Sequence, residues 1–474
     1  MKKSNFFKLA NLGLLAIIIM TSGFGCKLQS QETKEKTKDI TLTYWRVWDD
    51  EDAFAKIIED YQLAHPNIKI NYRKFRFEEY EPELLNALAE DRGPDMFSIP
   101  QSWLRSYQNK LEPMPPQLTM AYKEIKGGIK KEEITTLRTS QTPSLRRIQE
   151  LFADTVASDV VLRQQVYGLP LSLETLLMFY NKDILNQAGV SQVPTDWKSF
   201  QEAVAKITKI DQDNNIILSG AAIGTGANVE RSYDLLSVLM MQNGAQMSTA
   251  LGQPTFFTPT QRNQKISEGQ TALQFYTDFA SPVKSVYSWN GSMASSSFET
   301  FLAGKAAFTF DYNFQTPVIR SRAPKLNFGI APIPQIPGNA AVNFADYWIE
   351  AVSKKTQYRD EAWDFVLFAT TKSEEAQKFL ESTKRPTALK ELISKQIEDV
   401  DLYASVSQIL TAKTWYKGND VKVAEGAFRE MIDQYLAAVD ERQIKNIFNV
   451  ALQKIAQTID QEQNRPDPLP AETK

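Results

Sequence analysis

The stretch ITLTYWRVWDDEDAFAKIIEDYQLAHPNIKINYRKF, residues 40–75, decides the fold class of this chain. Apolar residues alternate with threonine over 40–44, which is the two-residue period of a strand. Residues 54–61 then repeat apolar side chains at helical spacing, and 68–72 alternate again. The order predicted is therefore strand, helix, strand.

The same order continues beyond this stretch. Residues 80–88 show helical spacing, Gly93-Pro94 breaks the pattern, and residues 96–99 form a third apolar strand. Strands that alternate with helices need crossover connections, so they pair in a mostly parallel sheet. We predict an α/β protein whose sheets are flanked by helices.

Further elements are predicted along the rest of the chain. They comprise strands at 176–180 and 306–310 and helices at 197–207, 232–242, 265–279 and 362–369. Residues 112–165 are less regular, and we expect helical insertions there, including the segment 121–137 that Gly127-Gly128 interrupts. The last 90 residues are predicted to be mainly helical.

The chain begins with a segment that is typical of export. Lys2, Lys3 and Lys8 precede an apolar run over 9–20, and small residues lead to Cys26. A cysteine at that place resembles a bacterial lipobox, in which the thiol is lipidated, although Gly23 stands where leucine is usual. We predict a signal peptide with lipobox over 1–26 and lipidation of Cys26.

Two polar segments are predicted to lie outside the fold. Residues 27–38 (KLQSQETKEKTK) are charged and lack periodicity, which indicates a flexible linker. Residues 461–474 end in a proline-rich run and are expected to be a disordered tail.

Composition excludes several classes of protein. There are 54 Lys and Arg against 57 Asp and Glu, and the charge becomes more negative once Lys2, Lys3 and Lys8 are removed. That balance argues against a nucleic-acid partner. With one cysteine and one histidine, thiolate metal sites and histidine-based catalysis are not expected, and we predict no cofactor and no metal. His65 precedes Pro66 and is interpreted as the end of a helix.

Three other motifs fail the test for the chemistry that they suggest. Gly224-Thr225-Gly226 lacks the lysine and serine of a phosphate-binding loop. The loop that starts at Asp211 lacks the glycine and final glutamate of a calcium loop. Ser295, Ser296 and Ser297 lack a nucleophile elbow and are expected to cap a helix. No catalytic residue is assigned.

Several longer motifs resemble one protein family, in order and in spacing. They are YGLPLSLETLLMFYNKDILNQAGV (167–190), FLAGKAAFTFDYNF (301–314), FGIAPIP (328–334), WIEAVSKKTQYRDEAWDFVLFATTKSEEAQ (348–377) and RPTALK (385–390). The chain resembles the bacterial extracellular solute-binding proteins of ABC importers, and the similarity is greatest to the sugar and glycerol-phosphate binders.

The resemblance implies a periplasmic-binding-protein-like fold of type II, with two lobes that close on a ligand about a hinge. Residues 39–171 and 331–380 would form lobe 1, and residues 172–330 and 386–460 would form lobe 2. It also implies an exported monomer, anchored to the outer face of the membrane, with ABC permease subunits as partners.

Residues that follow strand ends are the predicted ligand contacts, because ligands bind outside the carboxyl ends of parallel strands. After the first strand we select Trp48 and Asp49, since an indole stacks on a sugar face and a carboxylate accepts hydroxyl hydrogen bonds. If the strand continues to Trp48, alternation places Trp45 and Trp48 on opposite sides, and one of them belongs to the core. The alternative, that both indoles are packing residues, stays open.

The remaining candidates come from other strand ends and from the crossover. They are Gln101, Trp103, Glu174, Asp311, Tyr312, Phe314, Tyr347 and Trp348. By the resemblance, Glu174 coincides with a ligand-contacting glutamate, and an interlobe ion pair is the alternative. Phe314 or Tyr312 would replace a tryptophan that is common in the family. Arg385, Trp415, Asn228 and Arg231 are further candidates, and helix capping is the alternative for the last two.

These features predict a protein that captures a polar small molecule, a sugar or oligosaccharide, and delivers it to a permease without bond chemistry. Arg46 and Arg385 leave phosphorylated ligands open. Two alternatives remain: a secreted glycan-active hydrolase, which needs only two carboxylates, and a surface adhesin or signalling protein that reuses the fold.

Overall fold

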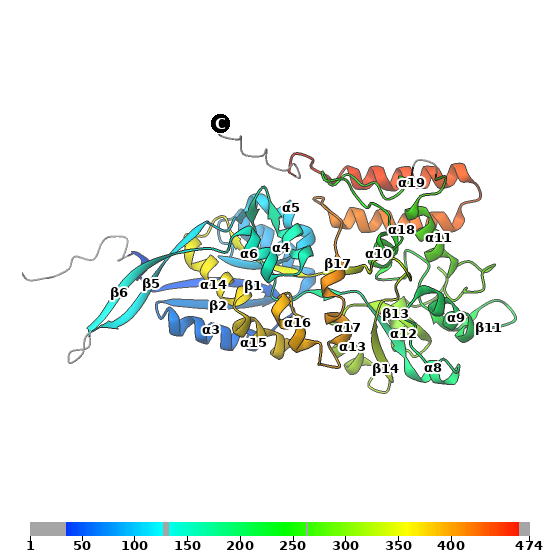
Figure 1. Ribbon diagram of the computed structural model, residues 1–474, viewed down its shortest axis with the longest axis horizontal. Coiled ribbons are helices and arrows are strands. Elements are labelled where there is room, and N and C mark those ends of the chain that lie inside the picture. The colour runs from blue at the N-terminus through cyan, green and yellow to red at the C-terminus, as the bar shows by residue number, and fades with distance from the viewer. Residues whose placement is uncertain (1–34, 127–131, 262–263, 464–474) are drawn as a thin grey trace, which may run out of the picture.

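Two five-stranded sheets, each flanked by helices, form the two halves of the molecule (Figure 1). The computed structural model describes residues 35–126, 132–261 and 264–463. The predicted signal peptide, Cys26 and most of the predicted linker lie outside the described residues. No helix among the described residues is long and apolar enough to cross a membrane.

The first sheet has the strand order β2-β1-β3-β16-β4. The strands are β1 (Ile40–Val47), β2 (Ile68–Phe75), β3 (Met96–Pro100), β4 (Leu111–Glu112) and β16 (Trp348–Ser353). β1 pairs in parallel with β2 and β3, as the strand-helix order predicts, and β16 returns from much later in the chain to pair antiparallel with β3. The predicted third strand therefore lies inside a mixed sheet.

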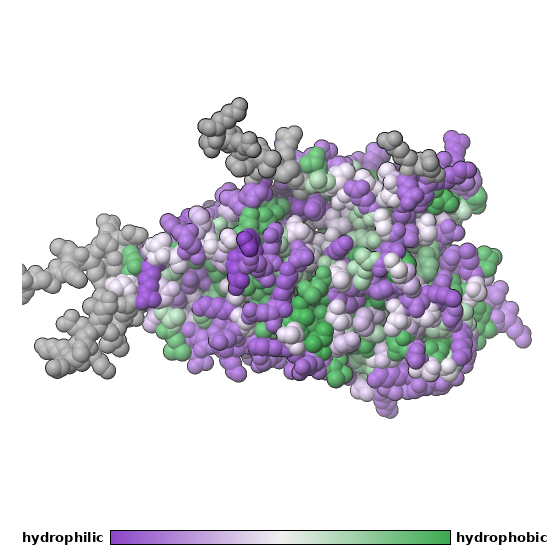
Figure 2. Space-filling view, viewed as in Figure 1, coloured by the Kyte–Doolittle hydropathy of each residue, from purple (hydrophilic) through white to green (hydrophobic). Residues whose placement is uncertain are grey.

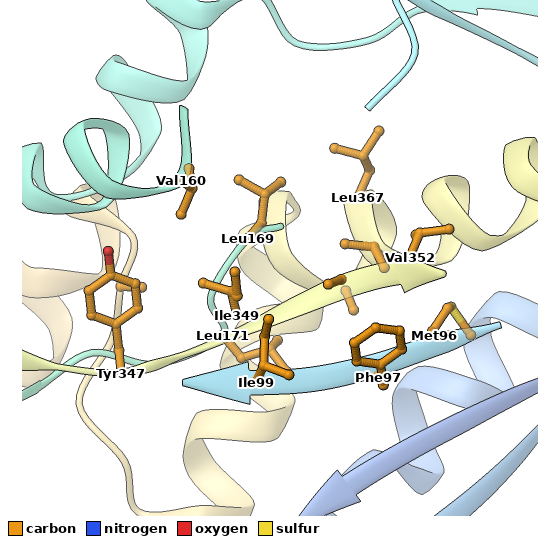
Figure 3. Packing of buried hydrophobic residues seen from close by; sticks show 14 of the residues in the cluster. Met96, Phe97, Ile99, Val160, Leu169, Leu171, Tyr347, Ile349, Val352 and Leu367 are labelled. Carbon is orange, nitrogen blue, oxygen red and sulfur yellow. The ribbon is translucent and has the colours of Figure 1, made fainter. Parts of the chain in front are cut away.

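Four helices are associated with the first sheet, and the first three of them follow the sequence predictions. They are α3 (Asp52–Ala64), α4 (Phe77–Ala89), α14 (Arg359–Thr371) and α15 (Ser373–Thr383). The ring of Phe54 on α3 meets that of Tyr44 on β1 edge to face at 5.5 Å. His65 caps α3, as predicted, through its backbone N–H to the carbonyl of Tyr61. Figure 3 shows Leu169 and Leu171 beside Ile349, in the same hydrophobic core.

The second sheet has the order β11-β12-β13-β10-β14. The strands are β10 (Leu177–Asn181), β11 (Lys209–Ile210), β12 (Ile216–Ala221), β13 (Ala306–Asp311) and β14 (Phe328–Pro332). Only the β12–β13 pair is parallel, so the expectation of a mainly parallel sheet is wrong for this half. β10 leads the chain into this half and β14 leads it back, so the two strands run in opposite directions.

The remaining helices mostly occupy the second half and the junction. They are α8 (Lys182–Gln187), α9 (Trp197–Ile207), α10 (Ser232–Gln242), α11 (Glu268–Asp278), α12 (Ser297–Leu302), α13 (Gln315–Arg322), α16 (Lys390–Gln396), α17 (Tyr403–Val406), α18 (Val421–Ala437) and α19 (Glu441–Ala456). The predicted helices at 197–207, 232–242 and 265–279 are present as α9, α10 and α11.

The expectation of helical insertions over 112–165 is wrong for its first part. β5 (Gln117–Lys126) and β6 (Glu132–Gln141) form a long antiparallel hairpin that projects from the first half (Figure 1). Leu118 and Met120, two residues apart, are both buried, which is strand periodicity. Helices follow only afterwards, as α6 (Leu145–Leu151) and α7 (Asp154–Val160), then a small hairpin of β7 (Val161–Leu162) and β8 (Gln165–Val166).

A small sheet lies where the two halves meet. Its order is β17-β15-β9, from β9 (Glu174–Thr175), β15 (Asn343–Asp346) and β17 (Ala412–Lys413). Apolar side chains of the segment 386–412 pack in the core of the first sheet, although the predicted boundaries assign this segment to lobe 2. This packing does not match a start of the second part of lobe 2 at residue 386, and the division into lobes stays a proposal.

Short helical turns follow β3 and precede β17. They are η1 (Gln101–Trp103), α5 (Leu104–Tyr107), η2 (Gln108–Lys110) and η3 (Ile409–Thr411). On the face shown in Figure 2, polar side chains predominate, and apolar residues form patches between them.

Both predicted flexible ends contact the fold where they are described. Lys36, in the predicted linker, pairs with Asp360 at 3.2 Å and Glu361 at 2.9 Å. Residues 457–463, the C-terminal strap, run from α19 to the first half. Gln463 Nε2 donates to the carbonyl of Arg105 and to Gln108 Oε1, each at 2.7 Å.

Because α18 and α19 pack in the core of the second half, the C-terminal strap ties the two halves together. Arg163 adds a third bond, since its guanidinium donates to the carbonyl of Glu462 at 2.8 Å. Residues 461–463 of the predicted tail are thus held by the fold, whereas 464–474 lie outside the described residues.

We predict that a chain ending at residue 459 has a free energy of unfolding lower by about 1–3 kcal/mol, because three net hydrogen bonds between the halves are lost. Thermal and urea unfolding measure this change. A chain ending at residue 463 is the matched control and should behave as the full chain. Equal stability of the two truncated chains would contradict a role for the C-terminal strap.

Candidate ligand-binding site

An arginine joins two of the predicted ligand contacts across the junction of the halves. Asp49 follows β1, Glu174 lies on β9, and Arg385 follows α15. Arg385 donates from Nε and Nη2 to Asp49 Oδ1 at 3.2 and 3.1 Å, and its Nη1 lies 3.7 Å from Glu174 Oε1. Asp49 and Glu174 are therefore brought together, and the ion-pair alternative for Glu174 matches this geometry.

A second arginine, Arg46, also contacts Asp49. Arg46 Nη2 lies 3.3 Å from both Asp49 Oδ2 and Glu350 Oε1, and the hydroxyl of Tyr44 donates to Glu350 Oε2 at 2.5 Å. The guanidinium of Arg46 also lies 4.6 Å from the ring centre of Phe54. Burial lowers the pKa of Arg46, but the neighbouring carboxylates outweigh it and raise that pKa overall, so the cation is retained.

Trp48 occupies a strained and exposed position beside this pair. Its φ is +75°, a region that bulky side chains rarely adopt, and its side chain is 49 % exposed. The indole stacks between Phe77 at 5.3 Å and Phe314 at 6.4 Å, with interplanar angles of 21° and 16°. Trp45, in contrast, is buried against Phe75. β1 ends at Val47, so the left-handed backbone at Trp48 and not strand alternation sets the direction of the second indole.

Residues after β13 provide the opposite wall. Phe314 stacks on Tyr312 at 6.0 Å, but Tyr312 is fully buried and its hydroxyl donates to Asp234 Oδ2 at 3.0 Å. Asp311 is also buried and accepts from Arg231 Nε at 2.9 Å. Of the three candidates from this strand end, Phe314 is therefore the one placed against the other half.

The four candidates on η1, just before β16 and at the start of β16 have different surroundings. Gln101 lines the cavity described below. Trp103 is buried and stacks on Tyr107 at 5.6 Å. Tyr347 is buried and its hydroxyl donates to Asp159 Oδ2 at 2.7 Å, so it serves packing. Trp348 is half-buried, and its ring lies 6.4 Å from that of Trp103.

A cavity of about 80 Å³ lies between the halves. Its lining combines helices, strand β15 and loops: Gln101, Ser102, Arg231, Tyr233, Asp234, Phe344, Ala345, Asp346, Thr414, Trp415, Tyr416, Val421 and Glu425. Ligand pockets usually measure about 300–1,000 Å³, so the halves must separate to admit a sugar. Asp234, Asp346 and Glu425 were not predicted, and no motif marks them, because they converge only through the fold.

Carboxyl groups around this junction have raised pKa values. Burial raises the pKa of Glu174 to about 7 against the opposing effect of Arg385, and burial raises that of Asp234 to about 7 against Arg231. Burial also raises the pKa values of Asp346 and Glu425. Burial at the junction therefore favours the protonated forms of these carboxyl groups, and the nearby arginines offset this only in part.

Comparison with known proteins relates the whole fold to one family. A family model described as bacterial extracellular solute-binding protein matches residues 48–376. The multiple sugar-binding protein of Streptococcus mutans serotype c (strain ATCC 700610 / UA159) is 24 % identical over 384 residues, which are 80 % of this chain and 82 % of that protein. The galactooligosaccharide-binding protein of Bacillus subtilis (strain 168) is 21 % identical over 400 residues, or 82 % of each.

Solved structures share the fold. The maltose-binding periplasmic protein MalE from Listeria monocytogenes, in complex with maltose, aligns with a TM-score of 0.67 at 16 % identity. The alignment covers 89 % of this chain and 99 % of that one. The predicted periplasmic-binding-protein-like fold is thereby confirmed.

The raised pKa of Glu174 predicts a pH-dependent stability. The folded state keeps a proton that the unfolded state releases between pH 4.5 and about 7, so the free energy of unfolding falls as pH rises through that window. For one such group, the free energy of unfolding changes by at most about 1.4 kcal/mol per pH unit.

Urea unfolding between pH 5 and 8 measures this slope. In Glu174→Gln the slope should be smaller, whereas the exposed Glu59→Gln variant should keep the slope of the parent chain. An unchanged slope in Glu174→Gln would show that Glu174 titrates normally.

Proposed function

The chain belongs to the bacterial extracellular solute-binding proteins, and we propose that it captures a carbohydrate between its two halves and delivers it to the permease subunits of an ABC import system. Family membership makes it an exported binding protein. The curated relatives whose names specify sugars support a carbohydrate ligand.

The position of Trp48 carries this proposal. A half-exposed indole held at φ +75° costs conformational energy, and strain of this kind is found at binding sites. Its neighbour Asp49 offers a carboxylate. The ring of Phe314, from the other half, lies 6.4 Å from the ring of Trp48. An aromatic face beside a carboxylate fits the apolar face and the hydroxyl edge of a sugar ring.

The mechanism is closure without bond chemistry. The first half holds the ligand through Trp48 and Asp49, with Gln101, Trp103 and Trp348 nearby. The second half closes and brings Phe314, which Tyr312 and Asp311 support from behind, while Arg385 and Glu174 complete the junction. Closure joins surfaces of both halves into one face that the permease recognises. The boundaries 39–171 with 331–380 and 172–330 with 386–460 remain our division into lobes.

Binding is favoured over hydrolysis and adhesion by the family itself, whose members are binding proteins. Asp49, the carboxylate beside the aromatic stack, contacts both Arg385 and Arg46 and keeps lone pairs that can accept a hydroxyl hydrogen bond. A hydrolase would need one carboxyl group free to act as the acid and another as the nucleophile or base. We therefore propose that no product is formed from the bound sugar.

We further propose that the protein is a monomer, tethered to the outer face of the membrane through lipidated Cys26. A single acyl chain binds membranes only marginally, so stable anchoring requires more than one chain.

We predict that Trp48→Ala lowers affinity for the bound sugar at least about tenfold, which corresponds to a stacking loss of about 1.4 kcal/mol. Thermal shift against a sugar library identifies the ligand, and titration calorimetry measures its Kd. Tyr403→Ala removes an aromatic side chain that is 52 % exposed elsewhere, and it should leave Kd unchanged. Release of a cleaved sugar would instead indicate the hydrolase.

For the anchor, we predict that Cys26→Ser abolishes incorporation of labelled palmitate and releases the protein from the membrane fraction. Immunoblotting of the membrane and released fractions provides the measurement, with Ser22→Ala as a control that leaves the thiol in place. Retention of Cys26→Ser on the membrane would contradict lipid anchoring at this residue.

A further inference from the structure

The arginines of the junction are already neutralised by carboxylates of the protein. Arg385 contacts Asp49 and Glu174, and Arg46 contacts Asp49 and Glu350. Arg231 bonds Asp311 at 2.9 Å and lies 3.9 Å from Asp234. An anionic ligand would have to displace one of these buried pairs, and breaking such a pair is costly because it leaves an uncompensated charge.

The cavity between the halves, in contrast, is lined by more acidic than basic side chains. Asp234, Asp346 and Glu425 line it, and Arg231 is the one cation among its described lining residues. Asp346 has no lysine or arginine within ion-pair distance among the described residues. Glu425 has Arg429 at 3.5 Å, on the same helix. The lining therefore holds three carboxyl groups against one arginine, and a cation that enters the cavity would favour their ionised forms.

Glu174 provides an independent observation beside the cavity. It is 5 % exposed, and neither carboxylate oxygen has a hydrogen bond of ordinary geometry. Glu174 pairs directly with Asp346 across the antiparallel strands β9 and β15. Directly opposed residues place their side chains on the same face, so Glu174 lies on the face from which Asp346 lines the cavity. Arg385 Nη1 lies 3.7 Å from Glu174 Oε1, which is ion-pair distance but too long for a hydrogen bond, so this buried carboxyl group can still accept one.

The aromatic residues of the lining also favour a cation. Tyr233, Phe344, Trp415 and Tyr416 surround the cavity together with the carboxylates. Aromatic faces attract cations through the ring quadrupole, and aromatic cages are a known way to bind ammonium groups. A volume of about 80 Å³ suffices for an ammonium group, since a water molecule occupies about 30 Å³.

We propose that the cavity lined by Asp346, Asp234 and Glu425 is a subsite for a protonated amino group, so that the protein selects amino sugars over neutral sugars and rejects phosphorylated or carboxylated ones. This proposal rests on the proposed carbohydrate-binding function and names its ligand class. In the sequence, Arg46 and Arg385 left phosphorylated ligands open. The proposal excludes such ligands, because both arginines are paired with carboxylates of the protein.

The test uses matched sets of sugars. Glucose, galactose and mannose are each supplied as the neutral sugar, the 2-amino sugar, the uronate and the 6-phosphate, as monosaccharides and as short oligosaccharides. Within a set that binds, we expect the amino form to have a Kd about tenfold or more below the neutral form, as one charge-assisted hydrogen bond would give. The uronate and the phosphate should bind at least about tenfold more weakly than the neutral form.

Two variants assign the preference to the cavity. Asp346→Asn should remove most of the preference for the amino form, measured as the ratio of the Kd of the neutral form to that of the amino form, and circular dichroism checks that the variant folds. Glu59→Gln removes an exposed carboxylate and should leave the preference unchanged.

The outcomes separate the two proposals. An anionic sugar that binds as tightly as its neutral partner, or an amino preference that is absent or persists in Asp346→Asn, overturns the subsite. If sugars bind but the amino form does not bind more tightly than the neutral form, and the neutral form more tightly than the anionic ones, the proposed function stands and the subsite fails. If no set binds, the proposed function fails, and the subsite falls with it.

Discussion

The contact of Arg385 with Asp49 and Glu174 is the interaction on which the site depends. These three residues are far apart in the sequence, and they meet only because two sheets and the small sheet at the junction converge. Buried ion pairs contribute little net stability, since desolvation offsets their attraction, but they penalise any arrangement that leaves one partner alone. The ion pair therefore specifies how the halves meet.

The same penalty makes the described conformation sensitive to its environment. Glu174 and Asp234 are ionisable groups removed from water, and burial raises the pKa of each to about 7. A ligand that donates hydrogen bonds or brings positive charge would relieve this cost, and opening would relieve it through solvation. A ligand shifts such a balance only through its differential affinity for the two states, so unsatisfied carboxylates suit a binding protein that must both close and release.

The fold was predictable wherever one element buries a clear apolar face. The helices α3, α9 and α10 and the strands β1, β2 and β3 follow directly from periodicity. The β5–β6 hairpin was not predicted, because Ala121 and Ile125 fit a helix as well as a strand when pairing is unknown. The antiparallel pairs of β10 also follow from the crossing of the chain between halves rather than from any local pattern.

For the site, the sequence by itself determined which residue types stand at strand ends: an indole and a carboxylate after β1, a glutamate in the crossover and a phenylalanine after β13. Strand alternation did not place Trp48, because β1 ends at Val47 and Trp48 has a left-handed backbone. Only the tertiary structure decided that Arg231 and Arg385 are already paired, that Tyr312 and Tyr347 are buried, and that Asp234, Asp346 and Glu425 share a cavity. The physical reason is that burial and pairing depend on residues hundreds of positions away, whereas periodicity depends only on neighbours along the chain.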